Sequence, residues 1–201
     1  MIHIVLGVVG FLIAFAFDHP YIDMRPWAKL PIGLIAFGLL GYSFVMVTAD
    51  PSTFAFPLAV STVAWALTAL FTLLFIYSVF IQIPFNQAYL GRGGQLRVVK
   101  TGTYAITRHP GVLWAFAGLA CLFLANGTKL LLVASPIWLI MDLIWVYLQD
   151  RFYFPKTIAG YEDYKGEVPM LIPTGASLRK GLRTLGRRDR NDTEVTSGRN
   201  A

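Results

Sequence analysis

Charged residues are scarce in this sequence. They make up 14% of its 201 residues, whereas 56% of the residues are hydrophobic. Soluble domains average about 25% charged residues, so this chain has too little charge to cover a water-facing surface of ordinary composition. The composition argues against a soluble domain and indicates a single domain whose solvent is a lipid bilayer.

Cysteine is almost absent as well. The one cysteine, Cys121, lies in an apolar run, so the chain can form no internal disulfide and has no Cys-x-x-Cys metal or redox motif. We expect Cys121 to be a small buried hydrophobic side chain, and we expect no metal site. Residues 1–17 lack a basic start and a small-residue cleavage site, which favours a retained helix over a signal peptide.

What the sequence does have is five long hydrophobic runs. A helix needs about 20 apolar residues to cross a hydrocarbon layer of about 30 Å, and the candidate spans cover residues 2–17, 30–48, 54–83, 111–125 and 130–148. Only the four residues "NGTK" separate the last two spans, which predicts a tight antiparallel hairpin. The predicted fold class is all-α: a polytopic integral membrane helical bundle of about five transmembrane helices, forming one domain over residues 1–176.

The positive charges are unevenly distributed along the chain. The net charge of +6 would suit a nucleic-acid partner, but with five spans sixteen of the 17 Lys and Arg residues fall on one side of the membrane. Only Lys129 falls on the other side. The positive-inside rule then predicts an outside N-terminus and a cytoplasmic C-terminus, and we expect no nucleic-acid partner. A prokaryotic cell membrane is the expected location because the chain is short.

The end of the chain carries an excess of these cations. Seven Lys and Arg residues lie in the last 23 residues. The segment 177–201 is polar, basic and poor in aromatic residues, so we expect a disordered cytoplasmic tail whose first part contacts anionic lipid headgroups.

A loop of unusual composition precedes the predicted hairpin, at residues 91–111. It contains the triplet Arg108-His109-Pro110. Proline suits the first turn of a helix, so Pro110 is expected to begin the fourth span. Arg108 and His109 then lie beside a helix N-terminus, whose unpaired N–H groups favour an anion.

A second such segment follows the hairpin, at residues 147–173. It begins with Gln149 and Asp150 and continues as an aromatic-rich interfacial stretch. In an antiparallel hairpin the start of the first helix lies next to the end of the second. We therefore expect His109 and Asp150 to lie close together.

These two segments together resemble a known superfamily of membrane enzymes. The pattern Gly-x-Tyr-x-x-x-Arg-His-Pro precedes the hairpin, and Gly-Tyr-x-x-Tyr-x-x-x-Val-Pro-x-x-x-Pro follows it. Over residues 90–173 the chain resembles the isoprenylcysteine carboxyl methyltransferase and phospholipid methyltransferase superfamily through Gly102, Tyr104, Arg108, His109 and Pro110, then Gly160, Tyr161, Tyr164, Val168, Pro169 and Pro173. Two positions depart from that pattern: Val112 replaces a tyrosine, and Gln149-Asp150 replaces Glu-Glu.

The resemblance implies S-adenosylmethionine as cofactor. Members of the superfamily hold it in a cytoplasmic pocket formed by the hairpin and the C-terminal segment, and a lipophilic acceptor approaches from the bilayer. The residues that the resemblance implies for cofactor binding are Tyr104, Arg108, His109, Asp150, Tyr161 and Tyr164. Arg108 is also a catalytic candidate, because a guanidinium can orient a carboxylate by a forked ion pair. A carboxylate at Asp150 would favour a sulfonium by Coulomb attraction.

Two other classes of function are open. The motif wording also resembles the NnrU-like branch of related membrane proteins, which includes a haem-bearing carotenoid isomerase. In that case haem would be the cofactor, with His109 and His19 as the axial ligands. The second alternative is a non-catalytic membrane scaffold, in which Arg108 only reaches toward phosphate headgroups and the tyrosines form an interfacial belt. The sequence gives no oligomeric state.

One acidic residue lies inside a predicted span. Asp142 stands in the apolar run "WLIMDLIWVY", where a charge costs at least about 2.5–3.5 kcal/mol on insertion scales. It must face the bundle, either hydrogen-bonded to Ser135, Ser78 or Tyr77 or as a catalytic candidate on the acceptor side. Methyl transfer from a sulfonium is an in-line displacement and needs a base only for an acceptor that is protonated at ambient pH. We therefore expect residues that bind and align rather than a proton-transfer residue.

Overall fold

The structure, a computed structural model, describes residues 1–17, 26–83 and 96–185. Most of these residues are helical, as expected from the sequence. His19, the second expected haem ligand, lies outside the described residues, and so does the part of the expected tail after residue 185.

Three helices are long and apolar enough to cross a membrane. They cover Lys29–Thr48, Leu58–Ile81 and Lys129–Thr157. The other two expected spans are also helices, α1 (Ile2–Phe17) and α6 (Pro110–Asn126), but with 16 and 17 residues they are shorter than the usual length of about 20. The described residues therefore contain three helices of membrane-spanning length and two shorter apolar ones.

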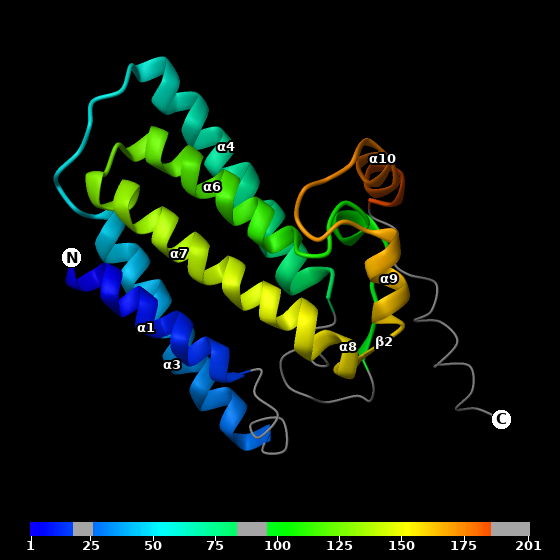
Figure 1. Cartoon of the computed structure of the whole chain (residues 1–201). Helices are drawn as coiled ribbons and strands as arrows, with labels where there is room; N and C mark the ends of the chain where they lie inside the picture. The colour runs from blue at the N-terminus through cyan, green and yellow to red at the C-terminus, as the bar shows by residue number, and fades with distance from the viewer. Residues whose placement is uncertain (18–25, 84–95, 186–201) are drawn as a thin grey trace, which may run out of the picture.

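Four of the five apolar helices lie side by side in two pairs, and the fifth lies between the pairs. Helix α1 packs against α3 (Pro26–Thr48), and α4 (Leu58–Ile76) packs against α6. Helix α7 (Lys129–Leu148) contacts α1, α3 and α6 and so lies between the pairs (Figure 1). The shared core contains Ile4 of α1, Val47 of α3, Leu122 of α6 and Trp138 of α7.

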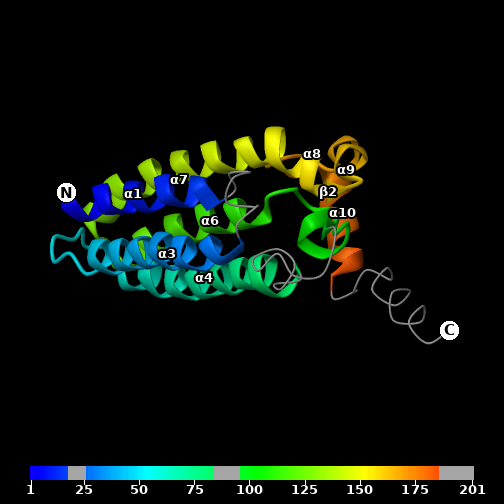
Figure 2. The same cartoon turned by 90° about the horizontal axis from the view of Figure 1, so that it is seen from below.

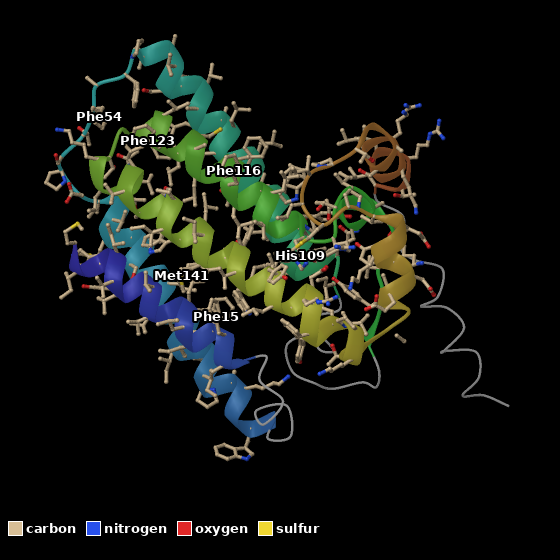
Figure 3. The ribbon with its side chains drawn as sticks, viewed as in Figure 1. Phe15, Phe54, His109, Phe116, Phe123 and Met141 are labelled. Carbon is tan, nitrogen blue, oxygen red and sulfur yellow. The ribbon has the colours of Figure 1, made fainter. Side chains whose placement is uncertain are left out.

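The outward faces of these helices are apolar. Large hydrophobic side chains are exposed on each of the longest ones, including Leu34, Leu58, Leu73 and Ile140, with Leu58 83% exposed. A helix that is apolar all round is typical of a membrane span, whereas a water-facing helix has a polar side. Figure 3 shows side chains projecting outward from the bundle along its length.

One end of the bundle, which we call the turn end, is closed by two connections, residues 49–57 and 127–128. Thr53 and Thr128 form an antiparallel β-bridge. The backbone N–H of Phe54 donates to the carbonyl of Gly127 at 2.7 Å, and the N–H of Lys129 donates to the carbonyl of Ser52 at 2.9 Å. The expectation that the third span begins at residue 54 is therefore wrong, because this backbone pairing holds the segment before Pro57 outside the helix.

The opposite end, which we call the polar end, carries the remaining short elements. These are β1 (Leu96–Arg97), the 3-10 turn η2 (Gly102–Ala105), α8 (Phe154–Thr157), β2 (Ile158–Ala159), α9 (Tyr161–Glu167) and α10 (Gly175–Thr184). Figure 2 shows all of the labelled ones beyond the same end of the bundle. Strand β1 pairs in parallel with β2, with Leu96 opposite Ile158.

Helix α10 corrects the expectation of a disordered tail from residue 177. It is ten residues long and begins with a capping box, in which the Thr174 side chain accepts from the Ser177 N–H and the Ser177 hydroxyl accepts from the Thr174 N–H. Such reciprocal capping satisfies two backbone donors at a helix start. Residues 175–184 are therefore helical despite their polar composition, and the capping box at Thr174 and Ser177 stabilises the start of the helix.

Two of the long helices turn into π-helix as they reach the polar end. Helix α4 continues as η1 (Tyr77–Ile81), where the Gln82 N–H donates to the Tyr77 carbonyl at 2.8 Å, and α7 continues as η3 (Gln149–Tyr153). Helix α7 itself ends at Leu148, as expected from the sequence, and the chain continues without a break through η3 into α8. Single π-turns often lie at functional sites because they redirect side chains.

Candidate functional site

The candidate site is a buried cluster of polar side chains around Asp150. The clustered side chains are those of Arg108 and His109, which precede α6, of Asp150 in the π-turn η3, and of Tyr161 at the start of α9. We call these four residues the Asp150 cluster. His109 and Asp150 are 41 residues apart in the sequence, and their side chains meet in this cluster, as expected.

The backbone holds the two segments together beside the cluster. The N–H of Arg108 donates to the carbonyl of Pro169 at 2.9 Å, and the N–H of His109 donates to the carbonyl of Met170 at 3.2 Å. Pro110 then starts α6 at its first turn, as expected from the sequence. Arg108 and His109 are therefore fixed by two backbone hydrogen bonds on one side and by a helix start on the other.

The Asp150 carboxylate is the centre of the cluster. Its Oδ1 accepts a hydrogen bond from the Tyr161 hydroxyl at 2.6 Å, and its Oδ2 accepts one from a terminal nitrogen of Arg108 at 3.2 Å. The His109 Nε2 atom lies 3.4 Å from Oδ1. These contacts are shielded from water, because the side chains of Arg108, His109 and Asp150 are each at most 10% exposed.

One donor in the cluster lacks a hydrogen bond. The Nε atom of Arg108 lies 3.0 Å from Asp150 Oδ1, but it is not aligned for a hydrogen bond with any acceptor among the described residues. The contact at this atom is therefore Coulombic. A buried donor without a hydrogen bond costs about 1–3 kcal/mol, and a ligand oxygen could satisfy it.

The tyrosines of the polar end act as donors. Burial, followed by the hydrogen bond to Asp150, raises the pKa of Tyr161 well above its usual range. Burial likewise raises the pKa of Tyr164, whose hydroxyl donates to the Tyr104 carbonyl at 2.6 Å. Both hydroxyls keep their protons at any physiological pH, so each stays a hydrogen-bond donor.

Tyr104 and Tyr164 lie beside the cluster rather than in it. The Tyr104 hydroxyl donates to the Ser78 carbonyl at 3.3 Å, toward η1 and away from Asp150. Together with the Tyr164 bond to its carbonyl, this places Tyr104 as a link between η1 and α9. The structure thus gives these two expected cofactor-binding residues contacts that hold the loop in place.

A second polar network, which sequence reasoning missed, supports the same loop. Ser78 is fully buried, and its hydroxyl lies 3.0 Å from both the Thr103 hydroxyl and the indole nitrogen of Trp114. The Gln82 side chain accepts from the Thr103 N–H at 3.2 Å. No local motif marks these residues, because they come from three separate segments.

Phe154 is the other residue that sequence reasoning missed. Its ring stacks on the His109 imidazole, with centroids 6.0 Å apart and planes inclined by 18°. The aromatic run "RFYF" after Asp150 was the available signal. The imidazole is therefore held between an aromatic ring and a carboxylate, and Figure 3 shows His109 where the bundle meets the terminal segments.

Asp142 does not belong to the cluster. It lies eight residues before Asp150 on the same helix, or about 12 Å along the axis. Its spacing places it on the face of α7 that carries Trp138 and Trp145, which contact Ile4 and Phe15 of α1. The expected hydrogen bonds to Ser135, Ser78 or Tyr77 are not formed among the described residues.

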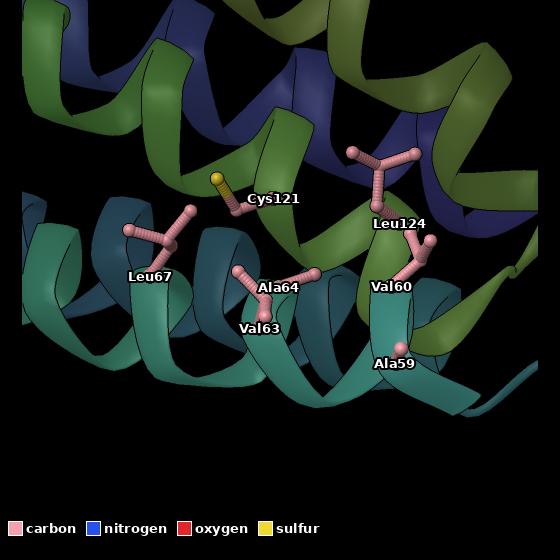
Figure 4. Close-up of a pocket in the computed structure, with 7 residues that line it drawn as sticks. All are labelled: Ala59, Val60, Val63, Ala64, Leu67, Cys121 and Leu124. Carbon is pink, nitrogen blue, oxygen red and sulfur yellow. The ribbon is translucent and has the colours of Figure 1, made fainter. Parts of the chain in front are cut away.

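Two further expectations concern single positions. Val112, where the resembled superfamily has tyrosine, is 7% exposed and belongs to the packing of α6. Cys121 is only partly buried. It lines an apolar hollow of about 380 Å³ between α4 and α6, together with Val60, Leu67 and Leu124 (Figure 4). That hollow is not lined by any residue of the Asp150 cluster.

Comparison with known proteins adds no relative. No family model matches the chain, and neither a curated protein nor a solved structure matches it. Within the described residues, no group of three or more His, Cys, Asp and Glu side chains is placed to hold a metal ion.

Proposed function

We propose that this chain is an integral membrane methyltransferase that transfers a methyl group from S-adenosylmethionine to a lipophilic or small thiol, carboxylate or amine acceptor. The observation that carries the proposal is the Asp150 cluster: residues of the two motif segments gather in one buried place and leave one guanidinium donor without a hydrogen bond. The proposal places the protein in the superfamily that its motif segments resemble.

The proposal includes a membrane topology of five spans. Helices α1 and α6 are about 24–26 Å long at 1.5 Å per residue, which spans a hydrocarbon layer when the bilayer thins slightly or polar side chains reach outward. The apolar outer faces support this arrangement. The positive-inside rule assigns the turn end to the outside and the polar end to the cytoplasm, in a prokaryotic cell membrane.

The residues present fit the proposed cofactor in charge and donor type. Arg108 offers its Nε donor to the carboxylate of the methionine moiety, and the resulting charge-assisted bond would fix that end of the ligand. The Asp150 carboxylate accepts from a ribose hydroxyl or an amino group, and its negative charge favours a cation nearby. Phe154 holds the His109 ring in place for a contact to the same ligand.

Once bound, S-adenosylmethionine supplies the electrophilic methyl group, and the chain supplies alignment and exclusion of water. Tyr161 keeps the Asp150 carboxylate in one orientation through its 2.6 Å hydrogen bond. No side chain in the cluster is needed as a base for a carboxylate acceptor. A neutral amine acceptor would need one.

Calorimetric titration of the purified full chain with S-adenosylmethionine tests the proposal. We expect saturable one-to-one binding that is weakened at least tenfold by Asp150→Asn and by Arg108→Gln. Lys156→Gln, on the exposed face of α8, is the matched control and should bind as the parent chain does. Absence of saturable binding, or binding unchanged in both cluster variants, would overturn the proposal.

Comparison with the product S-adenosylhomocysteine sharpens this experiment. It lacks the sulfonium charge, so the parent chain should prefer S-adenosylmethionine, and Asp150→Asn should reduce that preference. An equal loss of affinity for both molecules would show that Asp150 binds a part they share. An absorption spectrum of the same preparation tests the haem alternative, because a Soret band would replace the methyltransferase assignment.

A structural role is the second candidate. It is favoured by the number of hydrogen bonds and ion pairs that the cluster forms within the protein. Arg108 also donates from a terminal nitrogen to the Lys165 carbonyl at 2.9 Å. A scaffold function predicts that the cluster variants lower thermal stability while no ligand binds at all. Thermal unfolding of the variants with and without S-adenosylmethionine separates the two candidates.

A further inference from the structure

Helix α10 presents three different faces. Ser177 and Gly181 are buried, and Thr184 on the same face accepts a hydrogen bond from the Gly102 N–H at 2.9 Å. A methyl group added at Gly181 would collide with Ile106, so the lack of a side chain there allows close packing against the loop of η2. This face attaches the helix to the loop that leads to Arg108.

The second face is apolar and exposed. Leu178, Leu182 and Leu185 follow one another at spacings of four and three residues, which places them in one row. They are 43%, 69% and 51% exposed. In water such a row would stay uncovered on a helix that is otherwise polar.

The third face is cationic. Arg179, Lys180 and Arg183, with Ala176 and Thr184, line an open hollow of about 500 Å³. Lys180 pairs with Glu167 at 3.3 Å, whereas Arg179 and Arg183 form no ion pair with the described residues. Like charges four residues apart destabilise a helix slightly, so an anion between them would be favourable.

The direction of α10 fits an interface. It runs across the direction of the bundle helices and lies beyond their polar end (Figures 1 and 2). A helix that crosses the spans lies in the plane of the membrane, and a leucine row next to a cationic row is the pattern of helices that bind at the headgroup layer. The position of α10, its apolar row and its cationic row all fit the surface of a lipid bilayer.

We infer that α10 binds the surface of the surrounding bilayer, with Leu178, Leu182 and Leu185 at the acyl boundary and Arg179 and Arg183 on an anionic phospholipid headgroup. The inference rests on the membrane topology of the proposed function but not on its methyltransferase activity. Because Thr184 and Gly181 attach α10 to the η2 loop, lipid binding would also hold the loop that carries Arg108.

The cationic row is tested by lipid binding to the full chain in detergent. Fluorescent phosphatidylglycerol should bind the parent chain more tightly than fluorescent phosphatidylcholine. The double variant Arg179→Gln/Arg183→Gln should lose about 30-fold in affinity for phosphatidylglycerol, since each cation near an anionic surface contributes roughly a factor of five. Arg151→Gln/Lys156→Gln is the control with the same change of charge on exposed residues at the same end, and it should change the affinity less than twofold.

The leucine row is tested by its depth in a bilayer. In a Cys121→Ser background, a spin label at Leu182→Cys in nanodiscs with phosphatidylglycerol should be more accessible to oxygen than to a water-soluble nickel complex. A label at Glu162→Cys, on the exposed side of α9, should show the opposite order. Preferential access of nickel to the label at 182, or equal loss of affinity in both double variants, would overturn the inference.

Titration with S-adenosylmethionine in the same preparations keeps the two proposals apart. Lipid binding without cofactor binding would retain the α10 inference and reject the methyltransferase. Cofactor binding with no preference for the anionic lipid would retain the methyltransferase proposal and reject the α10 inference.

Discussion

The two ends of the bundle are held together by different kinds of interaction. At the turn end, the connections at 49–57 and 127–128 pair mainly through backbone groups. Among the described residues, the one Lys or Arg side chain beside these connections is Lys129, which lies over the Phe54 ring at 5.3 Å. At the polar end, the segments meet through a buried ion pair, tyrosine hydroxyls and a two-residue strand pair. Backbone pairing needs only the correct turn geometry, whereas a buried charge needs a partner supplied by a distant part of the chain.

The largest effect is expected from removing the central charge of the polar end. Asp150→Ala leaves Arg108 buried without its counter-ion, which costs about 3–5 kcal/mol. Thermal unfolding in detergent should show a large loss of stability. Asp163→Ala, which removes an exposed acidic side chain from the first turn of α9, should cost about 0.3–1 kcal/mol. Similar losses in the two variants would mean that the ion pair does not hold the polar end together.

The next largest effect is expected at the turn end, from Gly127→Ala. Gly127 has a φ of +75°, and an added Cβ would collide with the Phe54 carbonyl oxygen. Gly160 of the polar end is the matched control, because it has a φ of +76° and open space around the same position.

Gly160→Ala should therefore cost only the left-handed backbone strain of about 1–2 kcal/mol, and Gly127→Ala should cost clearly more. The difference in melting temperature between the two alanine variants measures the collision with Phe54 alone. If the two variants unfold at the same temperature, close approach at the turn end is not required.

A smaller effect is expected from Tyr161→Phe, which removes the hydroxyl that donates to Asp150 but leaves the ring in place. Hydrogen bonds to charged groups contribute about 1.5–3 kcal/mol. The loss of stability should fall below that of Asp150→Ala and should be nearly absent in an Asp150→Ala/Tyr161→Phe double variant relative to Asp150→Ala, because alanine removes the acceptor of the hydrogen bond. A fully additive double variant would contradict a direct coupling between the two side chains.

The smallest effect is expected from the exposed ion pairs of the polar end. The hydrogen bonds from Lys100 and Lys180 hold the pKa of Glu167 below its usual range. This contribution is present above the unfolded-state pKa of about 4.3 and is lost as the pH falls through the lower folded-state value.

Because the pair is exposed, Glu167→Gln should change stability by no more than about 1 kcal/mol at neutral pH. Below pH 4 the difference between the variant and the parent should shrink. A difference that grows in acid would contradict the lowered pKa. Unfolding curves of both proteins at neutral and acidic pH make this comparison.

The helical elements were predicted well from local patterns, and their ends less well. Pro110 marked the start of α6 correctly because proline suits a first helical turn. The start of α4 was placed four residues too early, since the apolar run from residue 54 does not reveal the backbone pairing with Gly127. Helix α10 was missed because basic, polar composition outweighed the Thr174 cap signal.

The candidate site was predicted in part. The expected proximity of His109 and Asp150 is confirmed, and Tyr161, which the resemblance implies, also contacts Asp150. The Ser78 network and the stacking of Phe154 on His109 could not be predicted from spacing, because the partners come from separate elements. Asp142 shared the chemistry of Asp150 but lies two turns away along α7.

The sequence by itself determined that the chain forms apolar helices, and it determined their order. It also predicted on which side of the membrane most of the Lys and Arg residues lie. Both follow from hydropathy and charge, which are properties of single residues and need no knowledge of the packing. Only the tertiary structure decided which other polar side chains join His109 and Asp150. The π-turn at Gln149–Tyr153, the parallel pairing of β1 with β2 and the docking of α10 on η2 together set those neighbours. Each depends on contacts between residues far apart in the chain, whose free energy exists only once the helices are packed.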